Sequence, residues 1–417
     1  MKLARSIGTI CLFATLPAYA MQVESSAAAA SRTKRHSATK HFLLYIGSFT
    51  GSAPNGHPDA SALSKGIYVA HFNAETGELN APTLAAEVTN PSFLAVSANH
   101  RFLYSITEAE PEAFVTAYAA DTHTGRLRML NKLPTGGAGT AFLSLDRTGK
   151  FVLLANYGSG SISAIQVLAD GSLGKLTSFV QHSLPRGPRG ARSTPPPPPT
   201  IPHPHAIIAS PRNHFVVVPD LGLNKIFIYE FDAANGVFNL PAKAVDLAPD
   251  DGPRHFVFSP DGKFGYLIAQ TSGNVEAFSW DEASGALTLI QTAPSLPKGL
   301  EANNMSAEIG LTPDGRFLYE SNRRTHGSTR ELGPDSIGVY NVNRETGTLT
   351  AVQESDQGNA IPRCFSIDPT GGYLLVGAQQ NNLVEVYRID PQDGKLSKTG
   401  QSISVHAPAC MQFVPAL

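Results

Sequence analysis

The chain has 417 residues, of which 42% are apolar and 16% charged, and a formal net charge of −2. This is the composition of an ordinary soluble globular protein that is long enough to bury a large core. It contains no basic run suited to nucleic acid, and no apolar stretch after the first twenty residues that could span a bilayer. We therefore expect no nucleic-acid partner and no membrane-embedded domain.

The first twenty residues, MKLARSIGTICLFATLPAYA, predict a secretory signal peptide. Two basic residues precede an apolar run from Ile7 to Leu16, and an Ala-Tyr-Ala site ends at Ala20. Such a run is too short to cross a bilayer and is typical of a cleaved leader. We expect a periplasmic or secreted protein with no membrane partner after cleavage, and a flexible low-complexity tether over residues 21–40. A first core strand is the weaker interpretation, because the repeats begin only near His41.

Two repeats interleave along the rest of the chain. The first is a β-hairpin, seen in PRHFVFSPDGKFGYLI (253–268), whose turn uses Pro to preset φ and Gly to accept a positive φ. Aligned on the first aromatic residue after the turn, its copies fall at Phe102, Phe151, Phe215, Phe264, Phe317 and Tyr373. The second repeat places turn glycines at Gly77, Gly125, Gly171, Gly236, Gly285, Gly347 and Gly394.

The repeats predict an all-β, seven-bladed β-propeller. Two hairpin turns per period mean four strands per period, and four-stranded units repeated radially are typical of propeller blades. The second turn occurs seven times but the first only six, so one hairpin is split between the chain ends. Residues 41–49 look like a second strand without a first, and residues 408–417 look like a first strand without a second. We predict one propeller domain over 41–417, whose last blade is closed by both ends and leaves no open sheet edge.

The long connections are expected on one face of the ring, at 50–65, 184–204, 294–305 and 324–335. Insertions on one face of a repeat fold usually mark the binding face. The Pro-rich insertion 184–204 should form a stiff extended loop beside the mouth of the channel. A docking motif for a partner domain is the alternative.

Charged and aromatic residues gather at equivalent positions on that rim. Ten residues before the reference aromatics stand Ser92, Ala141, His205, Arg254, Ala307 and Arg363, and the next residues are Phe93, Phe142, Ala206, His255, Glu308 and Cys364. Six residues after the aromatics stand Glu108, Tyr157, Leu221, Gln270, Arg323 and Gln379. In a propeller the first strand begins, and the second strand ends, on the same face. We therefore expect the polar members to converge.

Four segments carry a family resemblance: IPHPHAI, GPRHFVFSPDGKFGYLI, SAEIGLTPDGRFLYESNR and PRCFSIDPTGGYLLVG. They resemble the seven-bladed propeller lactonase family, which contains bacterial 6-phosphogluconolactonases and is similar to carboxymuconate cyclases. The resemblance extends over nearly the whole chain after residue 40. By position it implies that His205, Arg254 and Arg323 are catalytic. Gln270 stands where the family has Glu, and Gly310 stands where relatives often have His.

The chemistry of lactone hydrolysis fits these residue types. A histidine, with an ordinary pKa of about 6.5, suits a general base that activates water. Arg254, Arg323 and Arg363 can clamp an oxyanion or an anionic group of the substrate. Glu108 or Glu308 is expected to orient His205 or to hold sugar hydroxyls. The expected substrate-binding residues are Arg363, Glu108, Glu308, Gln270, His255 and Tyr157. Structural ion pairs of the arginines with the two glutamates are the alternative.

The sequence thus predicts an exported, monomeric lactone hydrolase that acts on a sugar or carboxylated lactone without a cofactor or metal. One alternative is a non-catalytic propeller that binds a ligand or partner at an arginine-lined mouth. Another is a lactonising cyclase of the carboxymuconate type. Cys364 and Cys410 share a register in adjacent first strands and could pair, but two buried free thiols are the favoured interpretation.

Overall fold

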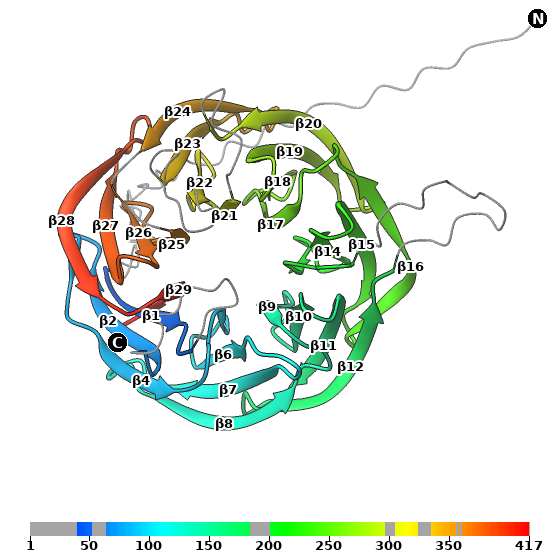
Figure 1. Cartoon of the computed structure of the whole chain (residues 1–417), viewed down its shortest axis with the longest axis horizontal. Coiled ribbons are helices and arrows are strands. Elements are labelled where there is room, and N and C mark those ends of the chain that lie inside the picture. The colour runs from blue at the N-terminus through cyan, green and yellow to red at the C-terminus, as the bar shows by residue number, and fades with distance from the viewer. Residues whose placement is uncertain are drawn as a thin grey trace, which may run out of the picture. The chain divides into compact units, whose positions relative to one another are not determined.

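The short apolar runs between turn residues fold into seven antiparallel sheets arranged around a centre (Figure 1). The computed structural model of the chain describes residues 40–51, 64–183, 201–296, 305–323, 335–355, 358 and 361–416. The predicted signal peptide, nearly all of the predicted tether and most of each long connection, residues 184–200 included, lie outside these described residues.

Each sheet has strands at four positions, counted outward from the centre. The innermost strands are β29 (Pro408–Pro415), β5 (Leu94–Val96), β9 (Thr140–Leu145), β13 (Ile208–Ala209), β17 (Pro253–Phe258), β21 (Met305–Leu311) and β25 (Pro362–Ile367). The second strands are β1 (His41–Ser48), β6 (Phe102–Thr107), β10 (Phe151–Asn156), β14 (Phe215–Asp220), β18 (Phe264–Ala269), β22 (Phe317–Arg323) and β26 (Tyr373–Ala378). The third strands are β2 (Gly66–Asn73), β7 (Phe114–Ala120), β11 (Ser161–Val167), β15 (Lys225–Asp232), β19 (Asn274–Asp281), β23 (Ser336–Val342) and β27 (Leu383–Ile389). The outermost strands are β3 (Glu78–Leu79) with β4 (Thr83–Glu87), β8 (Leu127–Pro134), β12 (Leu173–Gln181), β16 (Val237–Asp246), β20 (Ala286–Pro294), β24 (Leu349–Ser355) and β28 (Leu396–Ser404).

The two ends of the described chain share one blade. Strand β29 pairs with β1 in antiparallel register from Phe42↔Pro415 to Ser48↔Pro408, and β1 pairs with β2. Innermost strands of successive blades contact one another around the ring, except that β17 contacts the second strand β14 of the blade before it, and β29 contacts both β5 and β25 (Figure 1). The prediction of seven four-stranded blades, the last of them closed by both chain ends, is confirmed.

The two sequence repeats prove to be two sides of one contact between blades. Each reference aromatic is the first residue of a second strand. Six of the seven turn glycines face the reference aromatic of the preceding blade. At Gly236, where φ is +69°, an added Cβ would lie 2.3 Å from Cδ1 of Phe151. Glycine is needed there because only it combines a positive φ with so close an approach.

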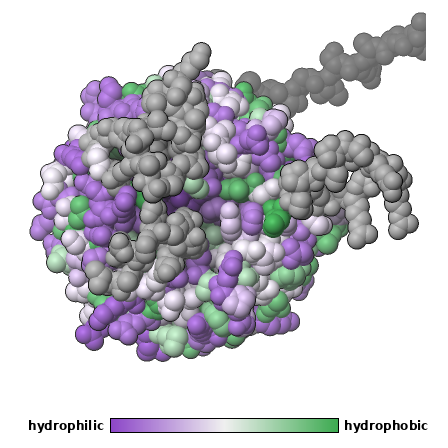
Figure 2. Space-filling model, in the orientation of Figure 1, coloured by the Kyte–Doolittle hydropathy of each residue, from purple (hydrophilic) through white to green (hydrophobic). Residues whose placement is uncertain are grey.

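The core lies between neighbouring blades. The second strands β10, β14, β18, β22 and β26 are buried along their whole length. The outermost strands alternate or are largely exposed, and the face seen in Figure 2 is correspondingly mixed, with hydrophilic residues around the central hollow. None of the described residues forms a helix with the length and apolarity that a membrane span requires.

The two cysteines outside the predicted leader are free and buried, as the sequence indicated. Burial raises the pKa of the Cys410 thiol to about 12, and burial also raises the pKa of Cys364. Both thiols therefore stay protonated near neutral pH, a state that suits packing rather than nucleophilic chemistry.

A buried carboxyl pair makes stability depend on pH. Glu276 and Asp251 are both buried, and burial together with the Asp251 charge raises the pKa of Glu276 to about 8. The folded protein then keeps a proton that the unfolded chain loses above pH 4.5, so the free energy of unfolding falls between pH 4.5 and 8. We expect Glu276→Gln to be about 2–4 kcal/mol more stable than the parent at pH 8, at about 1.4 kcal/mol per pKa unit, and nearly equal to it at pH 4.5.

Urea unfolding at the two pH values measures this difference. Glu230→Gln, at an exposed position of β15, is the matched control and should leave the pH dependence unchanged. A Glu276→Gln variant whose stability falls with pH as steeply as that of the parent would contradict the expectation.

Candidate functional site

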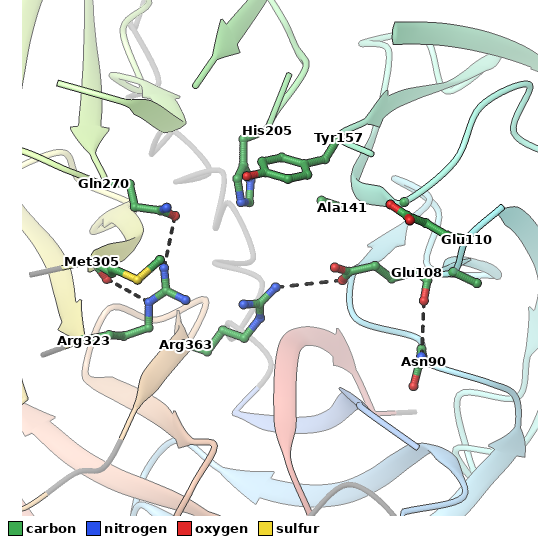
Figure 3. A pocket seen from close by; sticks show the side chains of 12 residues that line it. Asn90, Glu108, Glu110, Ala141, Tyr157, His205, Gln270, Met305, Arg323 and Arg363 are labelled. Carbon is green, nitrogen blue, oxygen red and sulfur yellow. Dashed lines mark hydrogen bonds and ion pairs between the residues drawn. The ribbon is translucent and has the colours of Figure 1, made fainter. Parts of the chain in front are cut away.

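A cavity of about 670 Å³ opens where the innermost strands begin and the second strands end (Figure 3). Its walls come from side chains on several blades: Asn90, Glu108, Ala109, Glu110, Gly139, Ala141, Tyr157, His205, Gln270, Met305, Arg323 and Arg363. Both predicted sets of rim positions are represented, so residues far apart in sequence meet here. Six of the nine predicted site residues line the cavity: His205, Arg323, Arg363, Glu108, Gln270 and Tyr157.

β-Bulges direct the inner-strand residues. The pairing register skips Ala141 in β9, Arg254 in β17 and Arg363 in β25. A bulged residue is left out of the ladder, and its strand bends, which re-aims the side chain. Arg363 reaches the cavity in this way. Arg254 and the next residue, His255, are likewise both buried rather than alternating between two environments.

Arg323, the last residue of β22, is buried but reaches the cavity wall. Its Nε–H donates to the carbonyl of Met305 (2.8 Å), and its Nη2 group donates to the carbonyl of Ser306 and to Oε1 of Gln270 (both 3.2 Å). Burial, followed by repulsion from Arg254 and Arg363, lowers its pKa well below the ordinary value. These described hydrogen bonds all go to neutral acceptors, so none of them cancels the guanidinium charge.

Arg363 faces the acidic side of the cavity. Its Nη2 lies 3.9 Å from Oε2 of Glu108 (Figure 3). Its guanidinium also lies 5.0 Å from the ring centroid of Phe49. The alternative of structural ion pairs therefore holds for Arg363 and Glu108. It does not hold for Glu308, whose ion-pair partner among the described residues is a histidine.

His205 lines the cavity and is itself largely buried. Its backbone N–H donates to the carbonyl of Pro219 (2.9 Å), which holds it beside the end of β14. Its Nδ1 has no hydrogen-bond partner among the described residues. Burial, followed by the charge of Arg254, lowers the pKa of His205 well below 6.5. The imidazole is therefore neutral near pH 7, which departs from the near-neutral pKa expected from the sequence.

Arg254, His255 and Glu308 do not line this cavity. The His255 ring packs 5.1 Å from the His205 ring, centroid to centroid, and edge-on to Phe93 and Phe142. Glu308 lines a second, smaller cavity of about 230 Å³ between inner strands. The expectation that His255 and Glu308 contact the substrate therefore differs from their placement. The physical reason is that inner-strand residues one step further along lie deeper in the channel.

His255, which is buried, and Glu308, which is partly buried, form a pair instead. Nδ1 of His255 lies 2.9 Å from Oε1 of Glu308. Glu308 therefore orients His255, whereas the sequence had suggested that Glu108 or Glu308 orients His205 or holds sugar hydroxyls. Nη1 of Arg254 is 3.3 Å from both ring nitrogens of His255, and it also donates to the carbonyl of Ala307. Because this atom is equally distant from both ring nitrogens, its N–H cannot point along the lone pair of either one. Neither contact is therefore a well-aligned hydrogen bond.

Burial is the main cause of the pKa shifts of Arg254, His255 and Glu308, which together form a layer beside the cavity. It raises the pKa of Glu308 to about 7 and lowers that of Arg254 to about 9, with repulsion from Arg363 as the next cause for Arg254. Burial and then the arginine charges lower the pKa of His255 well below 6.5. At neutral pH the layer thus holds a charged arginine, a neutral imidazole and a carboxyl group near its midpoint.

Sequence reasoning missed three polar or flexible lining residues. Glu110 lies two residues after Glu108 in the same connection, and this spacing of two acids was the available signal. Asn90 donates from its amide to the carbonyl of Glu108 (3.2 Å), a contact that no local pattern reveals. Met305 is the first residue of β21 and precedes Ala307, the residue of this strand that the repeat alignment marks.

The cavity therefore has a cationic wall, formed by Arg323 and Arg363, and an acidic wall, formed by Glu108 and Glu110, with His205 and Tyr157 beside them (Figure 3). Arginines bind carboxylate, phosphate or a developing oxyanion, and carboxylates accept hydrogen bonds from hydroxyl groups. Within the described residues, no group of three or more His, Cys, Asp or Glu side chains is placed to hold a metal ion.

Comparisons with known proteins agree with this fold. A family model described as a lactonase with a seven-bladed beta-propeller matches residues 43–413. The 6-phosphogluconolactonase of Bacillus subtilis is 32% identical over 374 residues, covering 89% of this chain and 98% of that protein. That of Formosa agariphila is 32% identical over 376 residues, covering 89% and 99%. The solved structure of the Pseudomonas aeruginosa periplasmic gluconolactonase PpgL has a TM-score of 0.77 and 28% identity, covering 90% of this chain and 100% of that one.

Proposed function

This chain belongs to the seven-bladed β-propeller lactonase family, and we propose that it is an exported lactone hydrolase in which His205 activates water and arginines bind the anionic groups. One observation carries the proposal: a neutral histidine lines the same cavity as the guanidinium groups of Arg323 and Arg363. A general base and an oxyanion clamp are the two parts that lactone hydrolysis requires.

The reaction can be written with these residues. A ring nitrogen of His205 takes a proton from water as the oxygen attacks the lactone carbonyl, and Arg323 stabilises the oxyanion that forms. When the ring C–O bond breaks, the imidazolium returns the proton to the departing ring oxygen. The product is the open hydroxy acid, and the histidine is neutral again. Arg254, beneath His205, acts through the field of its charge and makes no contact with the substrate.

The substrate we propose is a sugar lactone with hydroxyl groups and an acidic substituent. Glu108 and Glu110 suit the hydroxyls, while Arg363 suits the acidic group. The leader-like sequence of residues 1–20 supports export, and a relative of similar structure is named a periplasmic gluconolactonase. An exported enzyme would meet aldonolactones or other carboxylated lactones rather than a phosphorylated cytoplasmic metabolite.

The test is acid release by the purified protein from glucono-δ-lactone, 6-phosphogluconolactone and a carboxylated sugar lactone, with spontaneous opening subtracted. We expect enzyme-dependent release from at least one of them. If a folded protein gives no release above background, the proposed activity is wrong. The amide at Gln270, where the family has a carboxylate, favours a ligand-binding propeller as the second candidate. Calorimetric titration with gluconate would then detect that binding.

Gln270 is a neutral neighbour of Arg323 in the cationic wall. Gln270→Glu adds a negative charge there and is therefore expected to change substrate preference. A carboxylate placed 3.2 Å from Nη2 of Arg323 would form an ion pair and compete with an anionic substrate. We expect the ratio of kcat/KM for 6-phosphogluconolactone to that for glucono-δ-lactone to fall about tenfold, equivalent to about 1.4 kcal/mol.

Gln379→Glu is the matched control. It introduces the same change at the equivalent, buried position two blades further along the chain, outside the cavity lining. The ratio should stay the same in this variant. An unchanged ratio in Gln270→Glu as well would show that the charge of the cationic wall does not select the anionic substrate.

A further inference from the structure

Asp220, the last residue of β14, joins two stretches of chain that flank residues 184–200. The Nδ1–H of His182 donates to its Oδ2 (2.7 Å), and the backbone N–H groups of His203 (2.8 Å) and Leu223 (2.9 Å) donate to its Oδ1. The carboxylate is completely buried. Three donors that come from separate parts of the sequence therefore converge on one side chain.

The His182 side of this network is closed and rigid. The Tyr229 hydroxyl lies 3.1 Å from Nε2 of His182, and all three side chains are buried. Burial, then the charge of Asp220, raises the pKa of Tyr229, so the phenol keeps its proton and donates it to Nε2. This fixes the other ring proton on Nδ1, facing Asp220. The Asp-His-Tyr chain is thus oriented, but none of its members lines the cavity.

The His203 side leads to the cavity. The Nδ1–H of His203 donates to the carbonyl of Tyr157 (2.9 Å), and the two rings stack with centroids 4.4 Å apart and an interplanar angle of 17°. The Tyr157 ring in turn meets the His205 ring edge-on at 5.3 Å (Figure 3). Tyr157 and His205 both line the cavity. Because the rings of His203, Tyr157 and His205 contact one another in turn, the orientation of His203 affects that of the other two.

The backbone reinforces this connection. Pro204 forms a β-bridge with Asp220, and the N–H of Leu221 donates to the carbonyl of His203 (3.0 Å). The short segment 203–205 is therefore held against the end of β14 on both sides of the residue that carries the carboxylate. Loss of the Asp220 side chain would release the N–H of His203 and loosen the segment that presents His205.

We propose that Asp220 is a positioning residue for the reaction: through His203 it fixes Tyr157 and His205 in the geometry that the cavity requires. The proposal rests on the proposed lactonase function. Aspartate is required because three donors point at its two oxygens, and a carboxylate accepts from all of them. An asparagine that turns its NH₂ group toward the two backbone N–H groups leaves both without an acceptor, and one that turns it toward His182 forces the imidazole into its other tautomer.

The matched test compares Asp220→Asn with Asp368→Asn. Asp368 is also completely buried, and it accepts from the N–H groups of Thr370 (2.8 Å) and Tyr373 (2.6 Å) in a hairpin turn after β25, at the end of the strand away from the cavity. We expect both variants to lose stability to a similar degree. Only Asp220→Asn should lower kcat, by about 10–100-fold, because the loss is one of orientation. Equal kcat values in the two folded variants would overturn the proposal.

Two further measurements keep the outcome interpretable. His203→Ala breaks the later link at a partly exposed residue, so it should fold even if Asp220→Asn does not, and it should lower kcat as well. Imidazole NMR of His205, assigned with His205→Gln, reads orientation without any activity. Its resonances should move in Asp220→Asn and stay in place in Asp368→Asn. If they move while no lactone is hydrolysed, the positioning role stands and the proposed function fails. Unmoved resonances reject the positioning role.

Discussion

Replacing His205 by glutamine is expected to lower kcat by about 10²–10⁴-fold, the range that a positioned general base contributes. Glutamine keeps a polar group of similar reach but cannot accept a proton from water. His205 is suited to the role because it lines the cavity and its imidazole is neutral near pH 7. KM should change much less than kcat, since the proton moves only as the carbonyl is attacked.

The pH profile separates a base from a binding group. A base must be unprotonated, so activity should fall as pH decreases through the lowered pKa of His205, and this limb should lie below pH 6.5. The limb should be absent from the residual activity of His205→Gln. His214 has an exposed side chain and lies in the turn between β13 and β14 of the same blade. His214→Gln should therefore retain both kcat and the fall of activity at low pH. A His205→Gln variant with the parental profile would mean that another group takes the proton.

Replacing Arg323 by methionine is expected to lower kcat/KM by about 10²–10³-fold, the cost of removing one donor to an oxyanion. The effect should fall mainly on kcat, because the oxyanion exists only in the transition state. Arg323→Lys keeps a charge but not the planar pair of donors, so it should recover only part of the loss. Initial rates on the best lactone of the panel provide the measurement.

Arg323 also supports the backbone, so its variant needs a matched control. Arg147 donates from Nε to the carbonyl of Ser210 (3.1 Å) and from Nη2 to that of Ala209 (2.9 Å), away from the cavity. Arg147→Met therefore removes the same kind of hydrogen bonds without touching the site. We expect it to lower the free energy of unfolding but to leave kcat/KM within a factor of about two. Equal losses of activity in both methionine variants would reduce Arg323 to a structural residue.

The candidate site could be predicted from the sequence only in part. His205, Arg323, Arg363 and Gln270 were found because a strand begins and ends at fixed distances from its turn, and the turns are recognisable by Pro and Gly. The contact of Glu308 with His255 was not foreseen, since a regular register carries no information about bulges or about the depth of a side chain in the channel. Asp220 gave no signal, because its three donors meet only after the blades pack.

The fold itself was determined by the sequence. The number of blades follows from counting two kinds of turn, and the shared last blade follows from an unmatched strand at each end. Both depend on local rules: strand alternation, turn conformation, and the need of Gly236 and its equivalents for a positive φ against an aromatic ring. Such rules act within a few residues, so the one-dimensional pattern contains them.

The chemistry of the site was decided by the tertiary structure. The ordinary pKa of histidine says nothing of His205 once burial and Arg254 have lowered it, and Glu308 titrates near pH 7 only because the ring encloses it. Charge, burial and hydrogen bonding all depend on distances between blades. These distances join residues up to hundreds of positions apart, which is why the sequence placed the residues on a rim and only the packed ring selected those that face the cavity.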